Sequence, residues 1–179
     1  GLYLMFSNNA VQHFNHANGF PSDWIRCLTE DREHNLWVGA GSAGVIEMRP
    51  GIIEPLNPPE NWHGSTPQST TVARDGSIWV GSEGAGLYRF LNNEWKNYGT
   101  SAGLSNLYVW TVSQDAQGRI WAGTWGGGMF VQQGEHFVTP PGLEKVNVPM
   151  AATLQDADGT TWIGTANGLA RFDGVHFTS

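Results

Sequence analysis

The chain has 179 residues, including 24 glycines and nine tryptophans, and its formal net charge is −7. Only 14% of the residues are charged, and no basic stripe is present that could neutralise nucleic-acid phosphates or bind an anionic membrane surface. No run of about 18 apolar residues predicts a transmembrane helix. The many glycines and aromatic residues are instead typical of an all-β chain with tight turns.

The chain opens with two short apolar runs, residues 1–6 and 11–14, which match the second half of a unit that then repeats. Each complete unit carries a tryptophan that is followed two residues later by a glycine. These tryptophans are spaced by 42, 42 and 41 residues: Trp37, Trp79, Trp121 and Trp162. A period of this length, built from short strands and turns, is typical of a β-propeller blade.

We therefore predict an all-β chain that forms a β-propeller array of four-stranded antiparallel blades. The four repeats span about 22–56, 66–98, 106–139 and 147–178, after a leading half blade at 1–14, in one continuous segment, 1–179. Because the chain opens within a repeat, we expect a fragment of a larger propeller.

The third repeat shows the strands of a blade most clearly, at about 108–114, 119–123, 128–132 and 136–139. Alternation in its first strand predicts that Val109 and Thr111 point to one face of the sheet and Trp110 to the other. The repeated tryptophan lies on the second strand, where its large side chain is expected to pack between adjacent blades. In the first repeat, Asn35 takes the place of the glycine that is expected to provide a positive φ in the hairpin between the first two strands.

The third and fourth repeats carry the fullest motif. The third contains Gly103-Leu104-Ser105-Asn106 and then Gly118-Arg119-Ile120-Trp121-Ala122-Gly123-Thr124, and the fourth contains Gly168-Leu169-Ala170-Arg171-Phe172. Together they resemble the two-component regulator propeller repeat, and the resemblance covers essentially the whole chain. The second repeat departs from it, with Pro58-Pro59-Glu60-Asn61-Trp62 where the Gly-Leu-Ser-Asn motif would stand.

The resemblance implies a periplasmic or extracellular sensor region of a bacterial hybrid histidine kinase or a related regulator. Such propellers sense ligands, frequently polysaccharide fragments. This chain contains no kinase or transmembrane part and has fewer repeats than a complete propeller of the family. The same repeats could therefore belong to an extracellular protein without a kinase.

The residues themselves predict no catalytic or metal site and no cofactor. The six histidines are scattered, whereas a transition-metal site needs several converging donors. No nucleophile motif is present, and the carboxylates that end the first strands, such as Asp115 and Asp156, recur from repeat to repeat as turn residues do.

Loops on one face of the array provide the best candidate binding site. In propellers of this strand order, the loops between the second and third strands of a blade (b–c loops) share a face with the loops between blades (d–a loops). Trp125 lies in a glycine-rich b–c loop and has no counterpart in the other repeats, so it is either an exposed platform for a sugar ring or packs on a neighbouring blade. The non-periodic residues near the channel mouth complete the candidate set: Trp125, Trp24, Asp23, Arg26, Tyr108, Trp110, Asn106 and Trp62.

We expect a non-catalytic, extracytoplasmic module that binds a small molecule or an oligosaccharide, without contact to nucleic acid or membrane. Homo-oligomerisation stays open. Two alternatives also stay open: part of a propeller enzyme, a lyase or glycoside hydrolase, and a scaffold for protein interaction or dimerisation.

Overall fold

The computed structural model describes residues 1–6, 8–49, 52–56, 59, 62 and 66–179. Most of the unusual segment Pro58-Pro59-Glu60-Asn61-Trp62 lies outside these residues. Within the described part of the chain, regular helix is confined to three short 3-10 turns, η1 (His16–Asn18), η2 (Gly41–Ala43) and η3 (Thr100–Ala102). None of the helices in this part is long and apolar enough to cross a bilayer.

Four antiparallel sheets of four strands follow one another along the chain, each paired in sequence order. The first blade is β3 (Ile25–Glu30), β4 (Leu36–Ala40), β5 (Gly44–Arg49) and β6 (Ile52–Leu56), and the second is β7 (Pro67–Val72), β8 (Ile78–Ser82), β9 (Leu87–Leu91) and β10 (Glu94–Tyr98). The third is β11 (Val109–Gln114), β12 (Ile120–Thr124), β13 (Met129–Gln133) and β14 (His136–Val138), and the fourth is β15 (Met150–Gln155), β16 (Thr161–Thr165), β17 (Gly168–Phe172) and β18 (Phe177–Thr178). The hairpin of β1 (Leu2–Met5) and β2 (Val11–Phe14) forms the leading half blade.

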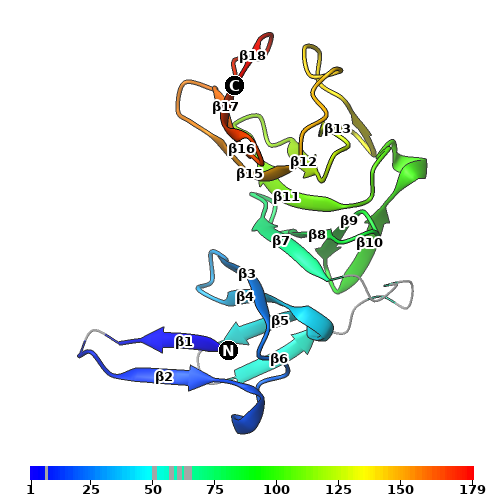
Figure 1. Ribbon diagram of the computed structural model, residues 1–179. Coiled ribbons are helices and arrows are strands. Elements are labelled where there is room, and N and C mark those ends of the chain that lie inside the picture. Colours follow the sequence, from blue (N-terminus) through cyan, green and yellow to red (C-terminus); the bar gives the residue numbers. More distant parts are fainter. Residues whose placement is uncertain (7, 50–51, 57–58, 60–61, 63–65) are drawn as a thin grey trace.

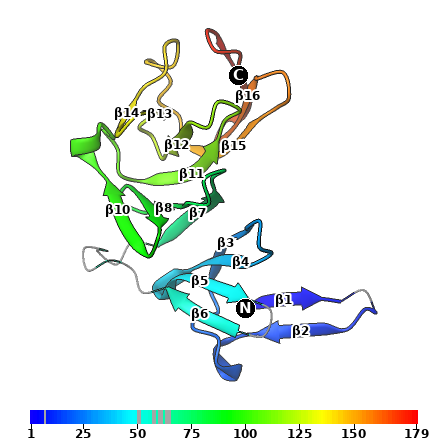
Figure 2. The same ribbon diagram turned by 180° about the vertical axis from the view of Figure 1, so that it is seen from behind.

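Figures 1 and 2 show these sheets following one another along an open arc. The first strands β3, β7, β11 and β15 lie side by side along its inner edge. The half blade packs on the first blade, where Leu2 and Phe20 share a core cluster with Val38 and Ile46. The predicted all-β propeller array with a leading half blade is thus confirmed.

The repeated tryptophans join successive blades, as the sequence predicts. Trp37 packs with Ile78, Val80 and Tyr88 of the second blade. Similarly, Trp79 belongs to the cluster that contains third-blade residues, and Trp121 packs on the fourth blade. Each of these three side chains is nearly inaccessible to solvent.

In the first three blades, the face that carries the repeated tryptophan packs on the next blade. In the fourth blade, no further blade covers this face among the described residues. Trp162 is only partly buried, and Leu154 and Leu169 beside it are 66% and 65% exposed. Leu169 lies where the first three blades bury Val45, Leu87 and Met129. The array is therefore open at this end, as expected for a fragment of a larger propeller.

At three of the four corners between the first two strands, the tryptophan indole N–H donates to a carboxylate. Nε1 donates to an Asp Oδ2 at 2.7 Å in the first blade, 2.8 Å in the third and 2.9 Å in the fourth; the pairs are Trp37–Asp31, Trp121–Asp115 and Trp162–Asp156. The second blade has Ala73 at the position of the aspartate. There the Trp79 indole donates to the Ser77 hydroxyl, 2.9 Å away, which in turn donates to Asp75 at 2.6 Å.

The same corners need one residue with positive φ. Gly76, Gly118 and Gly159 provide it with φ of 81°, 84° and 82°. In the first blade His34 takes this conformation, with φ 63°. The prediction that Asn35 would do so is wrong by one residue. Each of these glycines lies three residues before the tryptophan of its blade, and His34 lies three residues before Trp37.

Candidate functional site

The b–c loops and the d–a loops meet on one face of the array. In every blade, the residue after the second strand donates its backbone N–H to a carbonyl just before or at the start of the first strand. The four bonds are Gly41 to Trp24 at 2.8 Å, Glu83 to Thr66 at 3.0 Å, Trp125 to Tyr108 at 2.9 Å and Ala166 to Pro149 at 3.0 Å. Trp24 and Tyr108 therefore occupy equivalent positions on this face.

Each first strand also carries a β-bulge beside these bonds. The pairing register skips one residue in every blade: Arg26, Gln68, Trp110 and Ala151. The alternation predicted for the third blade is consequently wrong, since Val109 pairs with Thr124 and Thr111 with its neighbour Gly123, so that Val109 and Thr111 face opposite sides. A bulge of this kind bends the strand and re-aims the side chain of the extra residue.

The bulged residue and the first residue of the b–c loop form a pair in each blade, and we call these positions the rim. The backbone of the rim repeats, but its side chains do not. The pairs are Arg26 and Gly41, Gln68 and Glu83, Trp110 and Trp125, and Ala151 and Ala166. In the second blade the pair is joined by a hydrogen bond from Gln68 Nε2 to Glu83 Oε2, 2.9 Å long.

The third blade has the aromatic pair. The rings of Trp110 and Trp125 are stacked, with centroids 4.2 Å apart and planes inclined by 28°. Trp125 is 44% exposed, so one face of the ring is covered by its own blade while much of the side chain stays in water. It is thus partly exposed and stacks on a residue of its own blade.

Tyr108 extends the aromatic surface toward the second blade. It is 49% exposed, forms a β-bridge with Glu83, and places its ring over Gly84, where a Cβ would lie 3.6 Å away. The indole Nε1 of Trp110 is buried and has no hydrogen-bond partner among the described residues. Tyr108, Trp110 and Trp125 together form what we call the aromatic rim.

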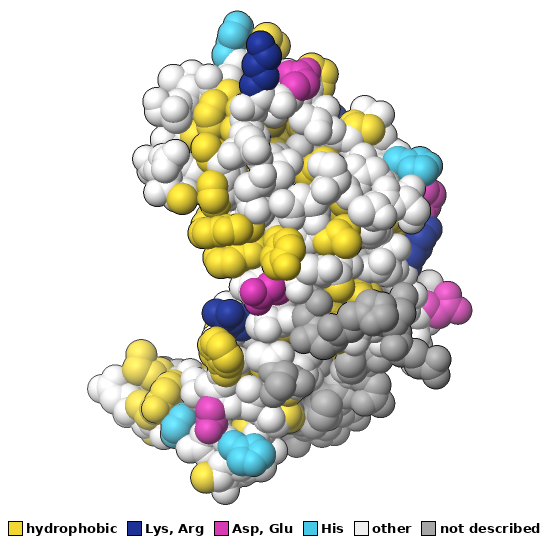
Figure 3. Space-filling model, turned by 45° about the vertical axis from the view of Figure 1, so that its right-hand side comes forward, with side chains coloured by type: hydrophobic (Ala, Val, Ile, Leu, Met, Phe, Trp, Pro, Cys, Tyr) yellow, Lys and Arg dark blue, Asp and Glu magenta, His cyan; other side chains and the backbone are white. Residues whose placement is uncertain are grey.

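In the first blade the rim carries a cation. The guanidinium of Arg26 lies 4.7 Å from the ring centroid of Trp24, which is 62% exposed. Figure 3 shows hydrophobic, acidic and basic side chains close together on the hollowed side of the molecule. This arrangement offers a flat apolar surface, hydrogen-bonding groups and one positive charge on a single face.

The remaining candidates have structural partners. Asn106 accepts the Tyr108 N–H at 2.8 Å and donates to the Trp125 carbonyl at 3.2 Å, so it fixes the loop beneath the aromatic rim. Asp23 accepts the backbone N–H of His16 at 2.7 Å. Both residues support the d–a loops through these bonds.

Trp62 lies apart from the aromatic rim. Its ring centroid is 4.6 Å from that of Tyr88 and 6.3 Å from that of Trp95, on the outer strands β9 and β10. The sequence reasoning also missed two rim residues, Gln68 and Glu83. Counting 42 residues back from Trp110 and Trp125 would have found them.

Among the described residues, no three His, Cys, Asp or Glu side chains converge as metal ligands would. The carboxylates with clearly altered pKa include those at the corners opposite the rim. Burial raises the pKa of Asp115, but hydrogen bonds from Trp121 and Arg119 more than offset this and hold it below its usual value. These shifts belong to the scaffold and not to the aromatic rim.

The fold and its loops define a β-propeller array with one face whose side chains differ from blade to blade. Two segments, residues 19–42 and 103–126, match the model of the two-component regulator propeller family. These two segments, which lead into the first and third blades, therefore match the family that the sequence resembles. No curated protein matches the chain significantly.

Solved structures share the fold at low sequence identity. The extracellular domains of a putative hybrid two component system and of a putative one component system, both from B. thetaiotaomicron, align over 94% and 96% of this chain, with TM-scores of 0.77 and 0.78 and identities of 22% and 17%. The chain spans 23% and 24% of those two proteins. Virginiamycin B lyase from Staphylococcus aureus aligns over 98% of this chain and 61% of its own length, with a TM-score of 0.77 and 13% identity.

Proposed function

We propose that this chain is part of a non-catalytic, extracytoplasmic sensor propeller of a bacterial two-component regulator, and that it binds an oligosaccharide on its rim. The observation that carries the proposal is the stacked pair of Trp110 and Trp125, which occurs in one blade only. The family repeats and the likeness to extracellular domains of putative regulators support the assignment to a regulator.

The geometry of the aromatic rim suits a sugar. The C–H face of a pyranose is apolar and flat, and the exposed part of a tryptophan ring covers it well. Trp110 holds Trp125 from behind, so little rotamer entropy is lost when a ligand binds. Gln68 and Glu83 lie beside Tyr108 and provide acceptors and a donor for hydroxyl groups.

The absence of catalysis is also part of the proposal. Among the described residues, the Tyr108 hydroxyl has no hydrogen bond to a base, and the one carboxylate at the rim positions, Glu83, accepts a hydrogen bond from Gln68. The lyase of similar fold gives the alternative class, a propeller enzyme. Shortening of a bound oligosaccharide during incubation with the chain would favour that alternative.

A glycan array followed by calorimetry tests the proposal, with Trp125→Ala as the decisive variant. A sugar that covers roughly 60 Å² of the ring gains about 1.5 kcal/mol, so removal of the ring should weaken binding about tenfold. Tyr3→Ala is the matched control, because Tyr3 is an aromatic residue of similar exposure on β1, outside the rim. Equal binding by both variants would contradict the proposal.

A further inference from the structure

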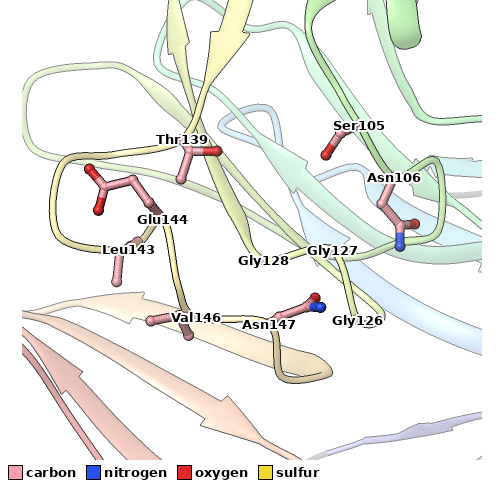
Figure 4. Close-up of a pocket in the computed structure, with 10 residues that line it drawn as sticks. All are labelled: Ser105, Asn106, Gly126, Gly127, Gly128, Thr139, Leu143, Glu144, Val146 and Asn147. Carbon is pink, nitrogen blue, oxygen red and sulfur yellow. The ribbon is translucent and has the colours of Figure 1, made fainter.

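A polar cleft is lined by the three glycines that directly follow Trp125. It lies between the b–c loop of the third blade and the d–a loops that lead into the third and fourth blades, and its volume is about 380 Å³. That volume is within the range of roughly 300–1,000 Å³ found for small-molecule sites. Its lining residues, drawn in Figure 4, are Ser105, Asn106, Gly126, Gly127, Gly128, Thr139, Leu143, Glu144, Val146 and Asn147.

One side of the cleft is the glycine loop that follows Trp125. Gly126 and Gly128 both have φ of +84°, and a Cβ on Gly127 would overlap the side chain of Asn106. Asn106 lines the cleft and also donates to the carbonyl of Trp125. A ligand that rests on Trp125 can extend past Gly126, where a Cβ would have nothing within 4 Å, whereas the Asn106 side chain covers Gly127 and the Val146 carbonyl faces Gly128.

The side chain of Asn147 lacks the backbone partner that its counterpart has, because a proline follows two residues later. It is the fourth-blade counterpart of Asn106, which accepts a hydrogen bond from the backbone N–H two residues later, at Tyr108. In the fourth blade that position is Pro149, which has no N–H. Among the described residues the amide of Asn147 has no hydrogen-bond partner, and Figure 4 shows it pointing toward the glycine loop.

The other polar groups of the cleft are hydroxyls. Figure 4 shows the hydroxyls of Ser105 and Thr139 pointing toward the same space, while the carboxylate of Glu144 points away from it. Glu144 accepts the backbone N–H of Gly142 at 3.0 Å, which explains its orientation. No Lys or Arg is among the lining residues, so an anionic group would find no cation here.

We propose that this cleft is a second sugar subsite, adjoining the one on Trp125, and that it selects a neutral, hydroxyl-rich saccharide unit. The inference rests on the proposed oligosaccharide binding at the aromatic rim and adds a requirement for at least two linked units. One unit stacks on Trp125, and the next is hydrogen-bonded by Asn147, Ser105 and Thr139 over the glycine loop. Arg26 lies two blades away and does not contribute to this subsite.

The test uses ladders of oligosaccharides, from one to six units, of neutral hexoses and pentoses and of galacturonic acid. Affinities are measured by calorimetry for the wild-type chain, Asn147→Ala and Asn167→Ala. Asn167 is the matched control, since it is an exposed asparagine in the b–c loop of the fourth blade and does not line the cleft. Loss of one or two hydrogen bonds should weaken the longer neutral ligands about three- to tenfold in Asn147→Ala.

A single sugar unit can occupy only the Trp125 subsite, so any affinity it shows should be the same in Asn147→Ala and the wild type. Asn167→Ala should match the wild type at every length. The subsite is contradicted if both asparagine variants behave alike, or if the galacturonic acid ladder binds more tightly than the neutral ones. In these cases a loss of binding in Trp125→Ala would still support oligosaccharide binding at the aromatic rim. Absence of binding by every ladder, or full binding by Trp125→Ala, would overturn the proposed function and the subsite together.

Discussion

The two ends of a blade differ in what they repeat. At the corner between the first two strands, backbone and side chains both recur, and three of the four tryptophans donate to an equivalent aspartate. At the opposite end, the backbone recurs down to the bulge and the loop hydrogen bond, but the side chains change from blade to blade.

The difference separates what builds the array from what the array can recognise. Residues that recur with the blade meet the same need in every blade, such as burial of an indole N–H. A residue that appears in one blade only, such as Trp125, meets no requirement that the other blades share. A fixed backbone that holds varied side chains is also how many proteins position their binding residues.

The largest effect should follow from removing a repeated tryptophan. Trp121→Ala deletes a buried ring between the third and fourth blades and should lower the free energy of unfolding by about 3–5 kcal/mol. Trp162→Ala should cost less, because that ring is only partly buried. Denaturant unfolding of both variants measures the difference, and equal losses would mean that the interface between blades does not set the cost.

A smaller effect is expected when the ring stays and its acceptor is removed. In Asp115→Ala the buried indole N–H of Trp121 loses its partner, which should cost about 1–3 kcal/mol. Asp158→Ala, an exposed change in a neighbouring hairpin, is the control. If the two substitutions have the same effect on unfolding, the corner bond does not stabilise the fold.

Acid should reduce the stability that Asp115 contributes at the corner between β11 and β12. The pKa of Asp115 in the folded chain lies below its ordinary value of about 3.9, so its contribution to stability is present above that pH and is lost as the pH falls through the folded value. Asp115→Asn should therefore flatten the fall in stability below about pH 4. Unfolding measured between pH 6 and pH 2.5 checks this, with Glu94→Gln on β10 as control. If stability falls as steeply with acid in Asp115→Asn as in the wild type, this prediction is wrong.

The smallest change in stability is expected at the rim. Trp125→Ala removes a partly exposed ring and one stacking contact, which should cost about 1 kcal/mol. Thermal melts of Trp125→Ala and Trp121→Ala, compared directly, test this. If the two variants are destabilised equally, Trp125 is a core residue and the distinction between rim and corner fails.

Much of the fold could be predicted because each blade repeats its own pattern. The spacing of the tryptophans indicated the four sheets, and the offset of 42 residues correctly aligned Arg26 with Trp110. The bulge itself was hidden, because Arg, Gln, Trp and Ala share no property that would mark the position. Without the bulge, simple alternation placed Val109 and Thr111 on the same face.

Candidate site residues were harder to predict for a related reason. Trp62 and Trp24 both precede a first strand, and the sequence alone does not show that one packs on the outer strands while the other is exposed at the rim. Asn106 and Asn147 occupy equivalent positions and both line the cleft, and only the hydrogen bonds show that Asn106 is held by the Tyr108 N–H while Asn147 has no such partner.

The most direct test of the separation between rim and corner is the set of indole N–H resonances in a ¹⁵N spectrum. They are assigned with single Trp→Phe variants, and the chain is titrated with the oligosaccharide that binds best. We expect the signals of Trp125 and Trp110 to shift, while those of Trp37, Trp79, Trp121 and Trp162 stay in place because their N–H groups are bound at the opposite corners. Shifts confined to the four repeated tryptophans would contradict the account and would place the ligand on the corner face.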